Sequence, residues 1–342
     1  MRPRVGIIAN VAAAHDVRRL SGHGSIVDHH EKTRILRRVL FGLQAVGVSD
    51  VLAMPDPYGL ALAAANTRGL EAQVRLIDMR LTHDERDSTL AAEWMALENC
   101  ACIVALGGDG TIRAIARGSR DTPLLAISTG TNNVIPRPVE GTVAGLAAGL
   151  FARGLIPVDA AVRRSKRLEV VREGEVIENA LVDAAVSTQL FLGARAITDL
   201  APLRQLWLTQ AVPGAIGLSA IGAHLHPLSP DAEQALLLNL NAADSLAGGV
   251  SVLAPIAPGL ALRAMVRSWR LLDIGEPIAV RDRPCVLALD GERTLSLLQG
   301  EPPTTIRANW TGPRLLDVEA AMEYAATNGL FLHPAQNDPI DE

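Results

Sequence analysis

The chain has 342 residues, of which 49% are hydrophobic, and a formal net charge of −5. This length exceeds the size at which a single core stops growing, so we expect two domains with large cores. The negative charge and the 3% aromatic content argue against a general nucleic-acid binder, which needs a basic surface. Three cysteines make neither a disulfide framework nor a four-ligand metal site, which favours an intracellular, cytoplasmic protein.

The first third of the chain alternates short apolar runs with helical patterns. The run 5–9 is too short for a signal peptide and predicts a strand. The elements expected next are a helix over 30–46, a strand near Val51, a helix over 58–66, a strand over 74–77 and a helix over 88–99. This alternation is typical of βαβ units, so it predicts a parallel sheet.

The pentapeptide 107–111, Gly-Gly-Asp-Gly-Thr, follows the apolar run 102–106 and opens a helix. Its glycines let the backbone approach a ligand closely, and the N–H groups at the start of the helix face an anion, which predicts a phosphate site. A carboxylate there would repel phosphate unless it holds a metal ion or meets a hydroxyl, so Asp109 indicates phosphoryl transfer. The alternative is a tight strand-to-helix turn in which Asp109 caps the helix.

A second polar loop, 128–133 (Ser-Thr-Gly-Thr-Asn-Asn), follows the next apolar run, 123–127. Ligands of open α/β sheets bind beyond the carboxyl ends of the strands, so we expect both loops to line one cleft. The alternative is an Asx or Ser/Thr turn without a ligand. A helix over 142–154 completes the first domain, which we place at residues 1–157.

The pattern changes at Gly154, Pro157 and the charged run 163–167, where the second domain begins. Short strands follow in close succession, which is typical of a mostly β domain and is placed here at residues 158–312. The expected strands cover 168–171, 176–186, 235–240, 250–253, 271–274, 278–280, 285–289, 294–297 and 304–308. The remaining segment, 313–342, holds an amphipathic helix over 318–327.

The longest stretch without Asp, Glu, Lys or Arg is 205–230. A membrane-spanning helix needs about 20 predominantly apolar residues, and prolines, glycines and histidines interrupt this stretch. We therefore expect a buried strand and an apolar pocket wall, and no membrane insertion. The histidine pairs at 29–30 and 224–226 lack Cys or Glu at ligand spacing, so we assign them to surface or pocket-lining positions.

These motifs resemble the ATP-NAD kinase superfamily, which includes the diacylglycerol and sphingosine lipid kinases, and within it the acetoin catabolism protein X branch. The resemblance rests on 107–111 and 127–133, and on later segments at 180–183, 193–196, 254–259 and 288–293. It implies an α/β nucleotide-binding domain with a parallel sheet and a mostly β, sandwich-like second domain. The active site is then expected in the cleft between the domains, and the last segment is expected to pack on the first domain.

The resemblance also implies roles for single residues, with ATP and Mg²⁺ as cofactors. Asp109 matches the aspartate proposed to deprotonate the acceptor hydroxyl. Because an exposed Asp has a pKa of about 3.9, positioning and charge neutralisation must supply most of the rate. The residues expected to bind nucleotide are Gly107, Gly108, Gly110, Thr111, Gly130, Thr131, Asn132, Asn133 and Asp183. The residues expected to organise the metal are Asp290 and Glu292, for which a simple hairpin turn is the alternative.

The sequence departs from the superfamily pattern in two places. NAD kinases carry an Asn before the acidic residue at Asp183, but Val182 stands here, which removes one ribose contact. After the first strand, residues 10–16 lack the lysine-bearing stretch of the relatives, and the chain has no Walker-type loop. Arg113 and Arg195 are therefore the candidate cations for phosphate.

Two classes of function follow. The first is an ATP-dependent kinase acting on a hydroxyl, most directly that of NAD to give NADP and ADP, or else that of a lipid or small diol. The second is a nucleotide-binding regulatory protein, linked to acetoin catabolism, that has lost turnover. Asp109, Asp290 and Glu292 favour the enzyme, whereas the altered stretch 11–15 favours the regulator. The expected partners are small molecules and a second copy of the chain, without nucleic acid.

Overall fold

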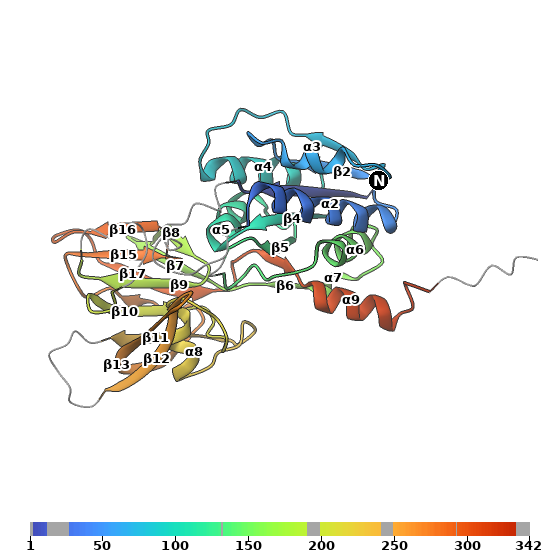
Figure 1. Ribbon diagram of the computed structural model, residues 1–342. Coiled ribbons are helices and arrows are strands. Elements are labelled where there is room, and N and C mark those ends of the chain that lie inside the picture. Colours follow the sequence, from blue (N-terminus) through green and yellow to red (C-terminus); the bar gives the residue numbers. More distant parts are fainter. Residues whose placement is uncertain are drawn as a thin grey trace, which may run out of the picture.

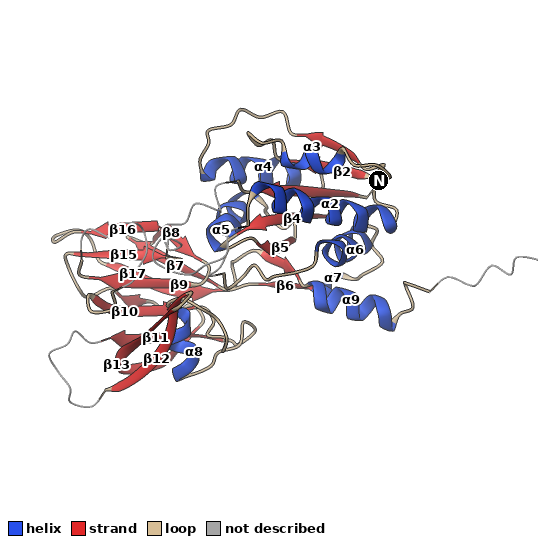
Figure 2. Ribbon diagram, in the orientation of Figure 1, coloured by secondary structure: helices blue, strands red, loops and turns tan. Residues whose placement is uncertain are grey.

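The computed structural model describes residues 3–11, 27–130, 133–189, 199–240, 249–291 and 293–332. Two domains lie side by side in it (Figure 1). One surrounds a sheet with helices, and the other consists mostly of strands (Figure 2). None of the helices within these ranges is both long enough and apolar enough to span a membrane.

A seven-stranded sheet in the order β3-β2-β1-β4-β5-β18-β6 forms the centre of the N-terminal domain. Its strands are β1 (Arg4–Ala9), β2 (Asp50–Ala53), β3 (Gln73–Leu76), β4 (Cys102–Gly107), β5 (Leu124–Ser128), β6 (Val162–Arg164) and β18 (Arg314–Leu316). Neighbouring strands run parallel except at the edge, where β6 is antiparallel to β18. The parallel sheet expected from the alternating pattern is thereby confirmed.

Helices cover both faces of this sheet. Two separate apolar clusters form because successive residues of a strand face opposite sides: Leu125 of β5 belongs to one and Leu124 to the other. The helices on the first side are α2 (His29–Ala45), α3 (Leu60–Ala65), α6 (Gly141–Ala152) and α9 (Val318–Thr327). Those on the second side are α4 (Glu85–Leu97) and α5 (Asp109–Gly118). The short α7 (Val158–Ala161) leads into β6.

Two antiparallel sheets build the C-terminal domain, in the orders β12-β13-β11-β10-β9-β15-β16 and β14-β17-β7-β8. The larger sheet has β9 (Asp183–Ser187), β10 (Leu203–Leu208), β11 (Gln234–Leu240), β12 (Val250–Ala257), β13 (Leu260–Asp273), β15 (Cys285–Leu289) and β16 (Arg293–Leu297). The smaller has β7 (Arg167–Arg172), β8 (Glu175–Ala180), β14 (Ile278–Ala279) and β17 (Thr304–Asn309). A common core of Trp207, Leu287 and Ile306 lies between them, as in a sandwich.

Several segments differ from the sequence prediction. The strand expected over 271–274 is the end of the much longer β13, and the short strands β6 and β18 were not expected. The single strand expected over 176–186 is two strands, because Leu181 and Val182 leave the smaller sheet and cross to the larger one. The uncharged stretch 205–230 contains the expected buried strand, β10, and also an unexpected helix, α8 (Ser219–Leu225). The apolar side chains of both elements fill a core cluster, which explains the lack of charge in this stretch.

Glu169 on β7 is a buried carboxylate that joins β7 to β17. It accepts hydrogen bonds from Arg307 Nε (2.9 Å), Asn309 Nδ2 (2.7 Å) and Thr311 Oγ1 (2.9 Å). Burial acts to raise the pKa of Glu169, but the hydrogen bonds outweigh it and lower the pKa to about 2. A carboxyl with a depressed pKa stabilises the fold above its unfolded-state pKa, and this stabilisation is lost as the pH falls through the folded-state value.

Replacement of Glu169 by glutamine is therefore expected to cost about 1–3 kcal/mol at pH 7, because charge-assisted hydrogen bonds are lost. It is also expected to reduce the acid-induced loss of stability between the ordinary value of 4.5 and about 2. Urea unfolding of the full chain at a series of pH values measures both effects. The control is Glu175→Gln, an exposed position on neighbouring β8. Identical pH dependence in wild type and Glu169→Gln would contradict the prediction.

Candidate active site

The two polar loops leave the sheet at the same edge. β4 and β5 are adjacent and parallel, and Gly107 at the end of β4 pairs with Ser128 at the end of β5. The loops are also hydrogen-bonded, since the Thr129 N–H donates to the Gly107 carbonyl (3.2 Å). The predicted positions Thr131, Asn132 and Glu292, and the candidate cation Arg195, lie outside the described residues.

Asp109 ties the first loop to the second. It is the first residue of α5, and its carboxylate accepts hydrogen bonds from the backbone N–H groups of Val134 (2.9 Å) and Ile135 (2.9 Å). The N-cap position is occupied by Gly108, which has no side chain to cap the helix. Asp109 is thus not the N-cap of α5. Asp109 is 8% exposed, and its side chain is held in one orientation by the loop opposite.

Asn133 explains why glycines stand in both loops. Its amide nitrogen donates to Ser128 Oγ (2.7 Å). A Cβ added to Gly108 or to Gly130 would come within 2.9 Å of the Asn133 amide. Neither loop could therefore carry a larger residue at these points without displacing Asn133. Glycine here permits close packing of the two loops around one amide side chain.

The carboxyl end of β1 adds two residues that motif spacing alone did not reveal. Asn10 follows β1 and its amide nitrogen donates to Thr111 Oγ1 (2.8 Å). Lys32 of α2 is fully buried, and its ammonium donates to the carbonyls of Asn10 (2.8 Å) and Val11 (3.3 Å). A lysine therefore does lie at the end of β1, although it comes from the following helix and not from a glycine-rich loop. The available signal was a lysine within the amphipathic helix.

Asp290 lies in the turn between β15 and β16, which confirms the predicted hairpin. Asp290 and Gly291 both have positive φ, at 50° and 66°, between the paired residues Leu289 and Arg293. The Asp290 carboxylate accepts hydrogen bonds from the N–H groups of Leu181 (3.0 Å) and Val182 (2.8 Å). The carboxylate therefore fixes the segment through which the chain crosses between the two sheets.

Arg113 connects this turn to α5. Its guanidinium lies 3.4 Å from the Asp290 carboxylate and donates to the Leu289 carbonyl (3.3 Å). The side chain of Arg113 is 3% exposed and that of Asp290 is fully buried. Arg113 also lies 3.6 Å from the Glu85 carboxylate. The side chain expected to contact phosphate thus serves as a bridge between the domains.

Asp183 begins β9 and is 8% exposed. Its carbonyl accepts a hydrogen bond from the Asp290 N–H (2.9 Å), so the candidate ribose ligand and the hairpin turn are adjacent. The preceding Val182 is 2% exposed and belongs to the apolar cluster under α4 and α5. At the position where NAD kinases carry an amide, this chain therefore places an apolar side chain in the core.

The described residues offer no ready-made metal site. They contain no group of three or more His, Cys, Asp or Glu side chains that could hold an ion. The oxygens of Asp290 face N–H donors and a guanidinium, which is the environment of a structural carboxylate. Metal binding by Asp290 remains a prediction from the resemblance.

Comparison with known proteins agrees with this geometry. Residues 5–155 match the ATP-NAD kinase N-terminal domain, and residues 166–309 match the acetoin catabolism protein X C-terminal domain. The chain is 38% identical over 341 residues to the acetoin catabolism protein X of Cupriavidus necator (strain H16), which covers 96% of this chain and 94% of the relative. The chain belongs to the acetoin catabolism protein X family. The resemblance inferred from the motifs is thereby confirmed.

Membership of the acetoin catabolism protein X family, with a kinase-type N-terminal domain, supports a kinase-type function that uses ATP. The family name itself does not state a reaction. A solved structure described as a diacylglycerol kinase from Bacillus anthracis str. Sterne covers 92% of this chain and 97% of its own, at 14% identity and a TM-score of 0.46. A likeness this distant carries no inference about the substrate.

Proposed function

We propose that this protein is an ATP-dependent kinase that phosphorylates a hydroxyl group of a small molecule, with NAD as the first candidate acceptor. The observation that carries the proposal is the placement of Asp109. Its carboxylate is fixed at the joint of two glycine-containing loops by the N–H groups of Val134 and Ile135. A carboxylate held beside a helix N-terminus suits phosphoryl transfer to a hydroxyl.

In the proposed reaction, Asp109 accepts the proton of the acceptor hydroxyl while the hydroxyl oxygen bonds to the γ-phosphorus of ATP. The bond between this phosphorus and the bridging oxygen breaks, and ADP leaves. The proton then passes from Asp109 to water. Because a carboxylate is a weak base for a hydroxyl, the main contribution of the site is to orient the two reactants. The kinase-type domain supports ATP as a cofactor, and we propose Mg²⁺ as the metal ion that accompanies it.

The phosphates of ATP are proposed to lie against the two loops. The start of α5 supplies backbone N–H groups, and Asn133 and Thr111 supply polar side chains beside them. The proposed nucleotide-binding set comprises Gly107, Gly108, Gly110, Thr111, Gly130, Thr131, Asn132, Asn133 and Asp183. Asp183 is the proposed contact for a ribose hydroxyl.

A second candidate function is a nucleotide-binding regulatory protein without turnover. The observation in its favour is the position of Arg113, whose guanidinium is held by Asp290 and Glu85. A kinase of this type needs positive charge near the transferred phosphoryl group. The buried Val182 points in the same direction, because it removes one contact to the ribose of NAD.

The deciding experiment incubates purified protein with ATP, Mg²⁺ and NAD and identifies the product by mass spectrometry, with Asp109→Asn as the blank. NADP formed only by the wild type would support the NAD kinase activity. ATP binding without NADP would reject NAD and direct the search to lipids and small diols. ATP binding without phosphorylation of any of these acceptors would support the regulatory function.

A further inference from the structure

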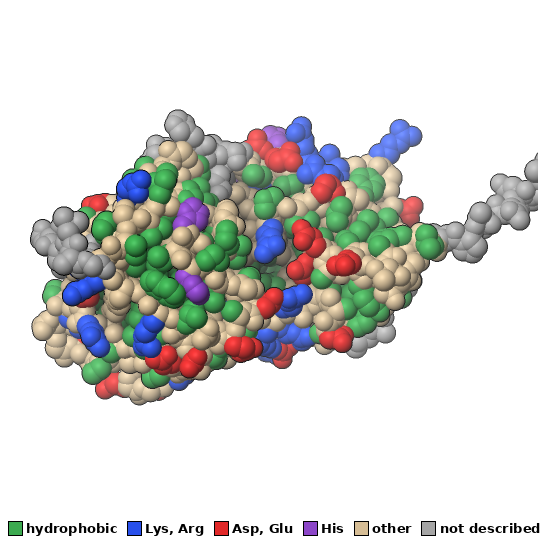
Figure 3. Space-filling view, turned by 90° about the horizontal axis from the view of Figure 1, so that it is seen from below, with side chains coloured by type: hydrophobic (Ala, Val, Ile, Leu, Met, Phe, Trp, Pro, Cys, Tyr) green, Lys and Arg blue, Asp and Glu red, His purple; other side chains and the backbone are tan. Residues whose placement is uncertain are grey.

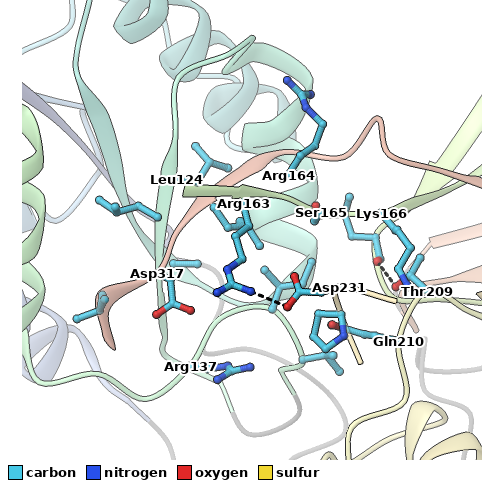
Figure 4. Close-up of a pocket in the computed structure, with 18 of the residues that line it drawn as sticks. Leu124, Arg137, Arg163, Arg164, Ser165, Lys166, Thr209, Gln210, Asp231 and Asp317 are labelled. Atoms are coloured by element: carbon cyan, nitrogen blue, oxygen red, sulfur yellow. Dashed lines mark hydrogen bonds and ion pairs between the residues drawn. The ribbon is translucent and has the colours of Figure 1, made fainter. Parts of the chain in front are cut away.

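A cavity of about 450 Å³ lies between the two domains. It is lined by β5, the following segment 134–139, β6 and the start of α9 on one side, and by the loops at 209–210 and 230–231 on the other (Figure 4). We call it the interdomain pocket. From below, the molecule is hollowed between its two halves, with basic and acidic side chains at the rim (Figure 3). The volume suits a small-molecule ligand.

The interdomain pocket adjoins the candidate active site but does not include its motif residues. Neither Asp109 nor the glycines of 107–110 line it. Apolar side chains form much of its wall, including Leu124 and Ala126 of β5 and Leu315 of β18. An apolar wall with a few polar groups is the usual composition of a ligand site.

Three polar side chains that line the pocket have N–H donors that are not bonded to another described residue. Gln210 is 9% exposed, and its amide bonds to no other described residue. Lys166 is 3% exposed, and its ammonium donates to the carbonyls of Ala232 and Gln234 (2.7 Å each). An ammonium has three N–H donors, so one remains for a ligand, beside the Trp310 ring whose centroid lies 5.3 Å from Nζ. The exposed guanidinium of Arg137 makes no ion pair within the described part of the chain.

Each carboxylate that lines the pocket forms an ion pair, caps a helix or lies in solvent. Asp231 pairs with Arg163 (2.6 Å). Asp317 caps α9 by accepting a hydrogen bond from the Ala320 N–H. Glu319 is exposed on the first turn of α9. The pocket therefore keeps N–H donors at Gln210 and Arg137 for a ligand, and none of the carboxylates that line it is buried, which favours an anionic ligand beside these donors.

We propose that the interdomain pocket binds a small organic acid with an apolar body, whose carboxylate or phosphate is held by Lys166 and Gln210 and attracted by Arg137 at the rim. The apolar body lies against Leu124 and Ala126. Such a ligand is distinct from the nucleotide and acceptor of the proposed kinase reaction.

The bound acid would also act on the candidate active site. Val134 and Ile135 line the interdomain pocket, and their backbone N–H groups hold the carboxylate of Asp109. A ligand in the pocket therefore contacts the residues that orient Asp109. The proposal extends to this coupling: occupancy of the pocket stabilises the segment 134–135 and with it the position of Asp109.

Calorimetric titration of the full chain with hexanoate, hexyl phosphate and hexan-1-ol tests the binding. We expect at least one of the two acids to bind one-to-one, at least ten-fold more tightly than the alcohol. The acid that binds more tightly shows whether the pocket prefers a carboxylate or a phosphate. No saturable binding of either acid up to about 10 mM, ten times a millimolar Kd, would overturn the proposal, as would equal binding of the alcohol.

Variants locate the site. Arg137→Ala and Gln210→Leu are each expected to weaken binding at least five-fold, and Ala126→Phe is expected to abolish it by filling the cavity. Arg68→Ala is the matched control, because Arg68 is also exposed and without an ion pair in the described residues. Arg137 is exposed, so its replacement tests the site even where a buried variant fails to fold. Unchanged affinity in both Arg137→Ala and Gln210→Leu would overturn the assignment.

Amide hydrogen exchange measures the coupling without reference to catalysis. The acid that binds more tightly in the titration is expected to slow hydrogen exchange of the Val134 and Ile135 amides in the wild type. It is not expected to do so in Ala126→Phe. Binding without slower exchange would overturn the proposed coupling to Asp109, whereas the assignment of the binding site would stand. This readout does not depend on turnover, so failure of the proposed kinase function and failure of the pocket are separate outcomes.

Discussion

Replacement of Asp109 by asparagine is expected to lower phosphoryl transfer by about 10³-fold, within the usual range for loss of a general base, while ATP affinity changes by less than about five-fold. The amide oxygen of asparagine can still accept one of the two hydrogen bonds from Val134 and Ile135, so the tie between the loops is largely kept. The proton acceptor is lost. ADP formation and single-turnover product formation measure the rate, and calorimetry measures ATP binding.

The matched control for this variant is Asp159→Asn, at an exposed position on α7 remote from the motif in sequence. It is expected to leave both rate and affinity unchanged. Turnover of Asp109→Asn within about five-fold of the wild type would remove Asp109 as the proton acceptor. A large loss of ATP affinity would instead assign Asp109 to nucleotide binding or to the folding of the loops.

Replacement of Asp290 by alanine is expected to lower the free energy of unfolding by about 3–5 kcal/mol, because breaking a buried ion pair leaves the other charge without compensation. The guanidinium of Arg113, 3% exposed, would lose its buried carboxylate. The N–H groups of Leu181 and Val182 would lose their acceptor as well. Urea unfolding of the full chain measures the change.

Two further variants test whether the expected loss of stability in Asp290→Ala comes from the ion pair between Asp290 and Arg113. Glu276→Gln breaks an exposed pair with Arg270 and is expected to cost less than about 1 kcal/mol. The double variant Arg113→Met/Asp290→Ala is expected to recover part of the stability lost in Asp290→Ala, since the orphaned charge is gone. A loss below about 1 kcal/mol in Asp290→Ala would show that the bridge between the domains contributes little.

The features that could be predicted from sequence are those encoded by neighbouring residues. The apolar runs that became β4 and β5 and the glycines after each strand are local signals, and they located both loops. The helix expected at 318–327 coincides with α9 because its apolar spacing and its Asp317 cap are local as well. The hairpin at Asp290 followed from the Asp-Gly pair alone.

The interactions that could not be predicted join distant parts of the chain. Arg113 was assigned to phosphate because it stands one turn after Asp109, but the buried carboxylate that it contacts is 177 positions away. The donors that hold Asp109 are backbone N–H groups, which any residue other than proline supplies and which leave no trace in the sequence. β6 and β18 have three residues each, too few to show a strand period.

The position of β18 has a consequence for how the protein is made. This strand comes from the end of the described chain and lies between β5 and β6, so it completes a sheet whose other strands are synthesised much earlier. In a nascent chain that stops at residue 157, Arg137 can still pair with the end of β5, but the edge at Leu124 lacks the partner that β18 supplies. We therefore expect the sheet of the N-terminal domain to be completed only after the last strand has left the ribosome, and residues 1–157 expressed alone to aggregate through the exposed edge.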